Sequence, residues 1–215
     1  MSHIAVIATA EGRYRDPWHP FDETTERVRE ILAERGFEVR ILPVDDALQA
    51  LEGADLLVVN AGDPWREGSF GAPRASVEGL EAALARGIGV LALHAAASSL
   101  RDFAAWAPAI GRVWLPEVSM HPEIGEAELD WADHPLAGAE PLAVFDERYS
   151  FLQAVGDSDV VATHEHAGHT HPVVWTRRHG AARVAVDLLG HSARSFDSAA
   201  HRDLLGRLAD WATGS

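Results

Sequence analysis

Hydrophobic and polar positions follow two alternating periods along the first half of the chain. Residues 21–36 and 77–87 carry apolar side chains at helical spacing, and each of these segments ends in Arg-Gly. Around them lie short apolar, β-branched runs, typical of strands buried on both faces, at 3–10, 37–42, 55–61 and 88–93. This order of elements predicts an α/β fold with a parallel sheet and helices on both faces.

The second half is richer in strand patterns joined by short turns. A helix over 201–212 closes the chain, with leucines and Trp211 on one face. The predicted strands are 142–152, 159–165, 172–178 and 183–189. Neither a repeat nor a linker interrupts the pattern, so we expect residues 1–215 to form a single domain.

Charge and composition narrow the classes of partner. Asp and Glu number 33 against 18 Lys and Arg, a net charge of −15, which disfavours binding to nucleic acid or anionic membrane surfaces. No stretch approaches the ~18 consecutive apolar residues of a membrane span, and the first residues do not read as a signal peptide. We therefore expect a cytoplasmic protein that acts on a small molecule. A homo-oligomer is compatible with this composition.

The chain contains no cysteine, which excludes disulfides, thiolate metal ligands and cysteine nucleophiles together. Residues 9–14, after the first strand, read TAEGRY and lack a Gly-rich phosphate loop. No nucleotide cofactor is therefore expected.

His94 is the leading candidate for a working site. It directly follows the predicted strand 88–93, and ligands of open parallel α/β sheets bind beyond the carboxyl ends of their strands. Ala92 and Ala96, two residues before and after it, are the small residues that a sharp strand-to-helix elbow requires. The pattern is similar to a nucleophile elbow with an imidazole in place of the nucleophile.

Several motifs in order give a resemblance across nearly the whole chain. They are GIGVLALHAAAS, FAAWAPAIGRVW, MHP, DHPL, FDERYSF, HPVVWTRRHGAARVAVDLLGH and RLADWA. Together they resemble the ThuA-like (trehalose utilisation) family, within the class I glutamine amidotransferase-like group. The resemblance implies a flavodoxin-like three-layer sandwich and places His94 where an amidotransferase has its catalytic cysteine. Without cysteine, thiol-dependent glutaminase chemistry is excluded.

Four further residues are candidates on the same grounds. His191 follows the strand 183–189, where the amidotransferase group has the base that pairs with the nucleophile, so it should face His94. Glu147 and Tyr149, in the family's Asp-Glu-x-Tyr element, point to the same side of an extended segment. The family also has a His-Pro at His121.

Other candidates lie in loops. His19 follows the first strand, in a loop where the family often carries a histidine, while Asp63 and Trp65 follow the third and could line a substrate rim. The histidine-rich segment 164–171 has Ala-Gly at its centre and is interpreted mainly as a solvated hairpin, and His134 as a turn residue.

Two mechanisms remain open from these residues. In one, His94, His121, His191 or Glu147 bind a divalent metal such as zinc. In the other, His94 and His191 act as general acid and base, oriented by Glu147. The resemblance implies a lyase or hydrolase acting on a sugar or keto-sugar derivative. The alternative is a non-catalytic module that binds a sugar or a partner.

Overall fold

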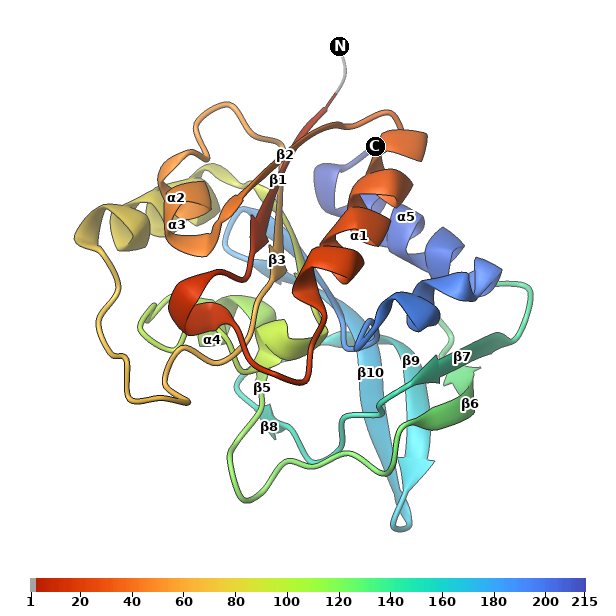
Figure 1. The fold of residues 1–215 in the computed structure, drawn as a ribbon. Helices are drawn as coiled ribbons and strands as arrows, with labels where there is room; N and C mark the ends of the chain where they lie inside the picture. Colours follow the sequence, from red (N-terminus) through yellow and green to blue (C-terminus); the bar gives the residue numbers. More distant parts are fainter. Residues whose placement is uncertain (1–2) are drawn as a thin grey trace.

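A nine-stranded sheet runs through the centre of the molecule in the computed structural model, which describes residues 3–215 (Figure 1). The first five strands in spatial order are parallel and the remaining four antiparallel, so the predicted mostly parallel sheet with an added hairpin is confirmed. The spatial order is β2 (Glu38–Pro43), β1 (Ile4–Thr9), β3 (Leu56–Asn60), β4 (Gly89–Leu93), β11 (Ala182–Asp187), β10 (His169–His179), β9 (Asp159–His166), β6 (Gly125–Trp131) and β7 (Leu142–Asp146).

Helices cover both faces of the parallel half, giving the predicted three-layer α/β sandwich. Helices α1 (Phe21–Glu34) and α5 (Ala199–Thr213) lie side by side on one face (Figure 1). The other face is covered by α2 (Val44–Gln49), α3 (Arg74–Arg86) and α4 (Trp106–Ile110). Among residues 3–215, no helix is both long enough and apolar enough to cross a membrane.

The continuous apolar runs exist because both faces of the parallel strands are buried. In β3, Leu57 and Val59 belong to the core beneath α2 and α3, while Leu56 and Val58 belong to the core beneath α1 and α5. All four are fully buried. Alternate residues therefore fill two separate cores, as a strand buried on both sides requires.

Element boundaries differ from the sequence prediction mainly in the second half. The strand expected over 142–152 ends at Asp146, because the backbone turns there and Asp146 accepts a hydrogen bond from the next residue's amide. No predicted element corresponds to α2, α4 or β6, or to the short antiparallel pair β5 (Arg112–Val113) and β8 (Gln153–Ala154). Strand β6 alternates charged and small residues and lacks the apolar run that marks a buried strand.

A buried ion pair joins the end of β11 to α5. The Nε2 atom of His201 lies 2.9 Å from an Asp187 carboxylate oxygen, and both side chains are fully buried. Burial opposes a charge on His201, but the adjacent Asp187, with Asp146 farther off, raises the pKa of this imidazole above its usual value. Asp187 also accepts a hydrogen bond from the backbone amide of Leu189.

This pair predicts a specific pH dependence of stability. Because the pKa of His201 is higher in the folded chain than in the unfolded chain, its contribution is complete below about pH 6.5 and is lost as the pH rises through the folded value. The free energy of unfolding, measured in urea, should fall as the pH rises above about 6.5, and less so in His201→Gln. An equal fall in both proteins would contradict the prediction.

Candidate functional site

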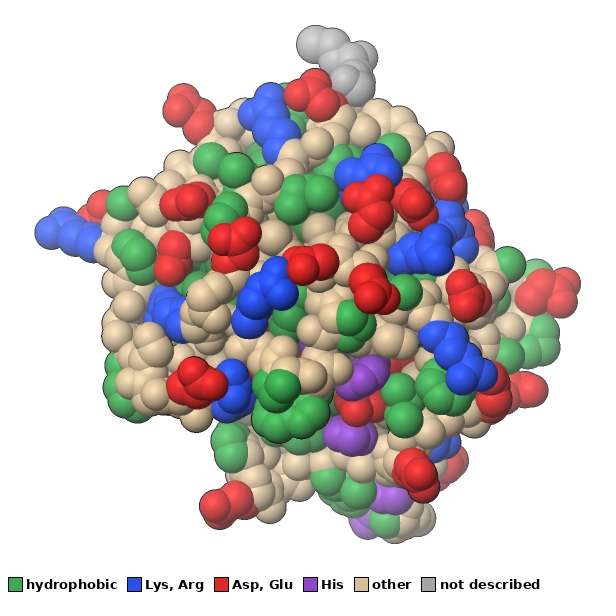
Figure 2. Space-filling model, viewed as in Figure 1, with side chains coloured by type: hydrophobic (Ala, Val, Ile, Leu, Met, Phe, Trp, Pro, Cys, Tyr) green, Lys and Arg blue, Asp and Glu red, His purple; other side chains and the backbone are tan. Residues whose placement is uncertain are grey.

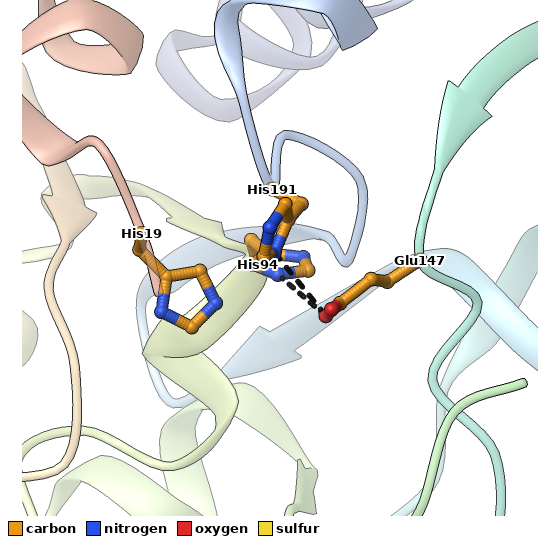
Figure 3. Close-up of side chains that lie close together, drawn as sticks. All are labelled: His19, His94, Glu147 and His191. Atoms are coloured by element: carbon orange, nitrogen blue, oxygen red, sulfur yellow. Dashed lines mark ion pairs between the residues drawn. The ribbon is translucent and has the colours of Figure 1, made fainter. Parts of the chain in front are cut away.

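Four side chains from distant parts of the sequence converge at the carboxyl ends of the parallel strands (Figure 3). His19 comes from the loop after β1, His94 from the end of β4, Glu147 from the end of β7 and His191 from the loop after β11. Each offers one nitrogen or oxygen atom, and these atoms lie within 4.8 Å of one another. We call these four residues the His–Glu cluster.

His94 occupies the sharp elbow that the sequence predicts. It begins a 3₁₀ helix, His94–Ala97, with a positive φ of 42°, a conformation that costs a non-glycine residue about 1–2 kcal/mol. Ala92 and Ala96 are fully buried around the turn, which explains the need for small residues. The Nδ1–H of His94 donates to the carbonyl of Leu188 at 2.7 Å, so Nε2 faces the cluster.

His19 is oriented by a neighbouring carboxylate. Its Nδ1 lies 2.8 Å from both oxygens of Asp16, which leaves Nε2 pointing away from that pair. One Asp16 oxygen also accepts hydrogen bonds from the backbone amides of Trp18 and His19, each at 3.0 Å. Asp16 therefore fixes both the loop and the imidazole, as the carboxylates behind metal-binding histidines do.

Asp146 holds two members of the cluster together. Its fully buried carboxylate accepts hydrogen bonds from the amides of Glu147 at 2.8 Å, Gly190 at 2.7 Å and His191 at 3.2 Å. Gly190 has a φ of 106°, which a residue with a side chain adopts at a cost. The end of β7 and the loop after β11 are thus joined through one side chain.

The donor atoms of the cluster fit a cation. Within the described part of the chain, His19 Nε2, His94 Nε2 and His191 Nδ1 are buried nitrogens without a hydrogen-bond partner. A carboxylate oxygen of Glu147 lies 3.5 Å from His94 Nε2 and 3.3 Å from His191 Nδ1 (Figure 3). Three imidazoles and one carboxylate are a donor set that suits zinc and similar divalent ions.

Charges in the cluster stabilise one another. Burial opposes ionisation of Glu147, yet the neighbouring His191 and His94 hold its pKa far below the usual range. Burial likewise opposes protonation of His94, but Glu147 and Asp146 raise its pKa. The pKa of His19 is lowered by burial, against the influence of Asp16. A cation here would take the place of the proton that Glu147 favours on His94.

Three members of the cluster, His19, Glu147 and His191, line a pocket of about 770 Å³. Tyr149 lines it with its ring 4.5 Å from that of His94 and 4.5 Å from that of Trp114. Burial raises the pKa of the Tyr149 phenol well above its usual value, so the hydroxyl keeps its proton. In Figure 2, histidine and acidic side chains lie together at the surface beside a hydrophobic patch.

Comparison with known proteins identifies the family. The family model described as "Trehalose utilisation", ThuA, matches residues 5–212. The chain belongs to the ThuA family. A search of curated proteins finds no match.

Solved structures share the fold at low sequence identity. A ThuA-like protein from Parabacteroides merdae aligns with a TM-score of 0.79 and 17% identity, over 99% of this chain and 89% of that one. A protein from Salmonella typhimurium described as cytoplasmic gives 0.62 and 12%, over 96% and 97% of the two chains. A protein from Thermoplasma acidophilum described as part of a GMP synthase gives 0.57 and 15%, over 98% and 96%. The last of these accords with the predicted likeness to the amidotransferase fold.

The predicted site residues of this ThuA-family chain fall into two groups. His94, His191 and Glu147 meet as expected, and Tyr149 lies beside them. The structure also places His19 in the His–Glu cluster. His121 lies next to the cluster, with Nε2 3.4 Å from the second oxygen of Glu147.

Asp63 and Trp65, the two rim residues predicted after β3, both form hydrogen bonds with other side chains. Asp63 lines the pocket, but its carboxylate accepts from Arg101 and from the amide of Trp65, both at 2.9 Å. Trp65 does not line this pocket, because its indole N–H donates to Asp102 and its ring faces Phe70. Trp65 therefore lies outside the pocket that Asp63 lines.

The histidine-rich hairpin of β9 and β10 has a structural role at its base. Its turn lies at Ala167 and Gly168 as predicted, with positive φ at both. The expected exposure fails for His164 and His171, which are 3% and 7% exposed. His164 Nε2 lies 3.2 Å from the carbonyl of Tyr149, and His171 Nδ1 accepts from the amide of Phe151. These two histidines support the segment that follows Glu147.

Sequence reasoning missed four residues that shape the site. Asp16 and Asp146 act through backbone amides, and Trp18 and Trp114 line the pocket. The signal for Asp16 was the Asp-Pro-x-His-Pro spacing, since an aspartate before such a turn caps the following amides. The partners of Asp146 are long-range and left no local signal.

Removing the Asp146 carboxylate should destabilise the whole protein. Asp146→Ala leaves three backbone amides without their acceptor, so we expect the free energy of unfolding to fall by about 3 kcal/mol or more. Urea denaturation measures this loss. Asp130→Ala, at an exposed acid on β6, is the matched control and should change the value by less than about 0.5 kcal/mol. Equal effects would contradict the role given to Asp146.

Proposed function

We propose that this ThuA-family protein is a divalent-metal-dependent enzyme that acts on a sugar or keto-sugar derivative as a lyase or hydrolase. The observation that carries the proposal is the convergence of three buried, unpartnered imidazole nitrogens on the carboxylate of Glu147. Buried polar atoms without partners are costly, so their concentration at one point favours a bound cation.

The residues that would hold the metal are His19, His94, Glu147 and His191. Their nitrogen and oxygen donors match the preferences of zinc. A bound cation would supply Lewis acidity, polarising a substrate carbonyl or hydroxyl oxygen or a water molecule. The carbonyl of Leu188 and the carboxylate of Asp16 keep His94 and His19 in the orientation that binding requires.

Two neighbouring side chains supply proton transfer and orientation. Tyr149 keeps its phenolic proton, so it can donate a hydrogen bond from Oη to a substrate oxygen in the pocket. His121 lies at the more open side with Nε2 near Glu147, where it can accept or release a proton. Glu147 stays ionised, with one oxygen facing His94 and His191 and the other facing His121.

The substrate class rests on the family and on the character of the pocket. The matching family is described by trehalose utilisation. The pocket combines aromatic walls at Trp18 and Trp114 with polar groups, a lining that suits the alternating C–H and O–H surfaces of a sugar ring. A cytoplasmic location, in line with the description of the Salmonella typhimurium neighbour, is part of the proposal.

Metal analysis tests the proposal most cheaply. Protein produced in zinc-supplemented medium should contain about one zinc ion per chain. His94→Ala should lose most of it while circular dichroism shows an unchanged fold. His179→Ala, at a histidine outside the cluster at the end of β10, should keep the wild-type content.

Two results would argue against this function. Metal-replete protein that holds no stoichiometric divalent ion would reject the metal-dependent enzyme, and turnover retained in that state would favour His94 and His191 as an acid–base pair. Tight sugar binding without turnover across a panel of disaccharides and their keto derivatives would favour the non-catalytic binding module.

A further inference from the structure

Trp18 is an exposed aromatic side chain directly beside a cluster residue. It is 63% exposed, and it lines the same pocket as His19, the next residue in the chain. An indole that is mostly exposed and lines a pocket offers an apolar face that a ligand can cover. Nothing in the arrangement of the metal donors requires an indole here.

The loop that carries Trp18 is held rigidly. Pro17 and Pro20 flank the Trp18–His19 pair. The carboxylate of Asp16 accepts hydrogen bonds from the backbone amides of Trp18 and His19. The loop sits directly on Gly62, where a Cβ atom would come within 2.7 Å of an Asp16 oxygen. The backbone that carries the indole is therefore held in place, so that little backbone entropy is lost when a ligand covers the ring.

Arg66 joins Trp18 at the pocket lining. Its guanidinium carbon lies 5.6 Å from the centre of the Trp18 ring, and the group also donates to the carbonyl of Arg15. Closer to the cluster, Trp114 packs on Tyr149 and forms a second aromatic wall. The pocket thus has two aromatic surfaces: one is Trp114 packed on Tyr149, and the other is Trp18 on the loop after β1.

We propose that Trp18 is a stacking platform for a second ring of the substrate. The inference rests on the proposed function, in which the first ring is held near Tyr149 and the His–Glu cluster. The apolar C–H face of an outer sugar ring would cover the indole, and Arg66 would donate hydrogen bonds to its hydroxyls. The substrate class is therefore a carbohydrate of at least two rings, and a volume of about 770 Å³ gives room for it.

Calorimetric titration of zinc-supplemented protein with trehalose and with glucose tests the platform. Trp18→Ala should weaken trehalose binding several-fold to about tenfold and leave glucose binding within about twofold, because only the outer ring loses its contact. Trp18→Phe, which keeps an aromatic face, should restore part of the affinity. Phe70→Ala is the matched control: Phe70 is 70% exposed, does not line the pocket, and its loss should change neither affinity.

The outcomes separate the platform from the proposed function. Zinc content should be equal in all four proteins, so a failure of the metal site appears there and not in the sugar titration. Equal trehalose affinity in wild type and Trp18→Ala, an equal loss for both sugars, or no trehalose binding by the wild type would overturn the platform. A wild-type dimer that dissociates in Trp18→Ala with unchanged sugar affinity would also overturn it, assigning Trp18 to contact with a second copy.

Discussion

The carboxylate of Asp146 is the constraint on which the rest of the site depends. Strand β7 lies at the edge of the sheet, separated from β11 by β10, β9 and β6, yet Asp146 at its end binds the amides of Gly190 and His191 beyond β11. The antiparallel half of the sheet must therefore curl back over the ends of the parallel strands. This closure places Glu147 opposite His94 and turns an open edge of the sheet into a walled pocket.

A histidine at the elbow limits the chemistry that this part of the fold can perform. His94 has the positive φ and the neighbouring alanines of a nucleophile elbow, but its Nδ1 donates to the Leu188 carbonyl and its Nε2 faces a carboxylate. An imidazole in that position is a ligand or a proton carrier, and the chain has no thiol to perform acyl transfer. His19, held by Asp16, adds a third imidazole on the side of the first loop. The same aspartate sets the position of Trp18, so the placement of a cluster residue and of the proposed ring platform are coupled.

The sequence predicted those parts of the molecule that follow from local patterns. The parallel strands appear as apolar runs, and His94 and His191 could be placed because the carboxyl ends of such strands share one edge. Glu147 required the family motif, since its strand lies far away in the sheet order. Strand β6 escaped prediction because charged residues alternate along an exposed face. The partners of Trp65, such as Asp102, are set by tertiary contacts that no local pattern reveals. The burial of His164 and His171 likewise depends on residues 149–151, which no local pattern brings near them.

In the proposed metal site, three imidazoles and one carboxylate form a single set of ligands for a cation. X-ray absorption spectroscopy of the zinc-loaded protein tests this ligand set, because the fine structure reports the number and type of donor atoms. We expect three imidazole nitrogens and one carboxylate oxygen, at about 2.0–2.2 Å from the zinc, with one imidazole lost in His19→Ala. A shell made mainly of oxygen atoms, or one unchanged by His19→Ala, would contradict it.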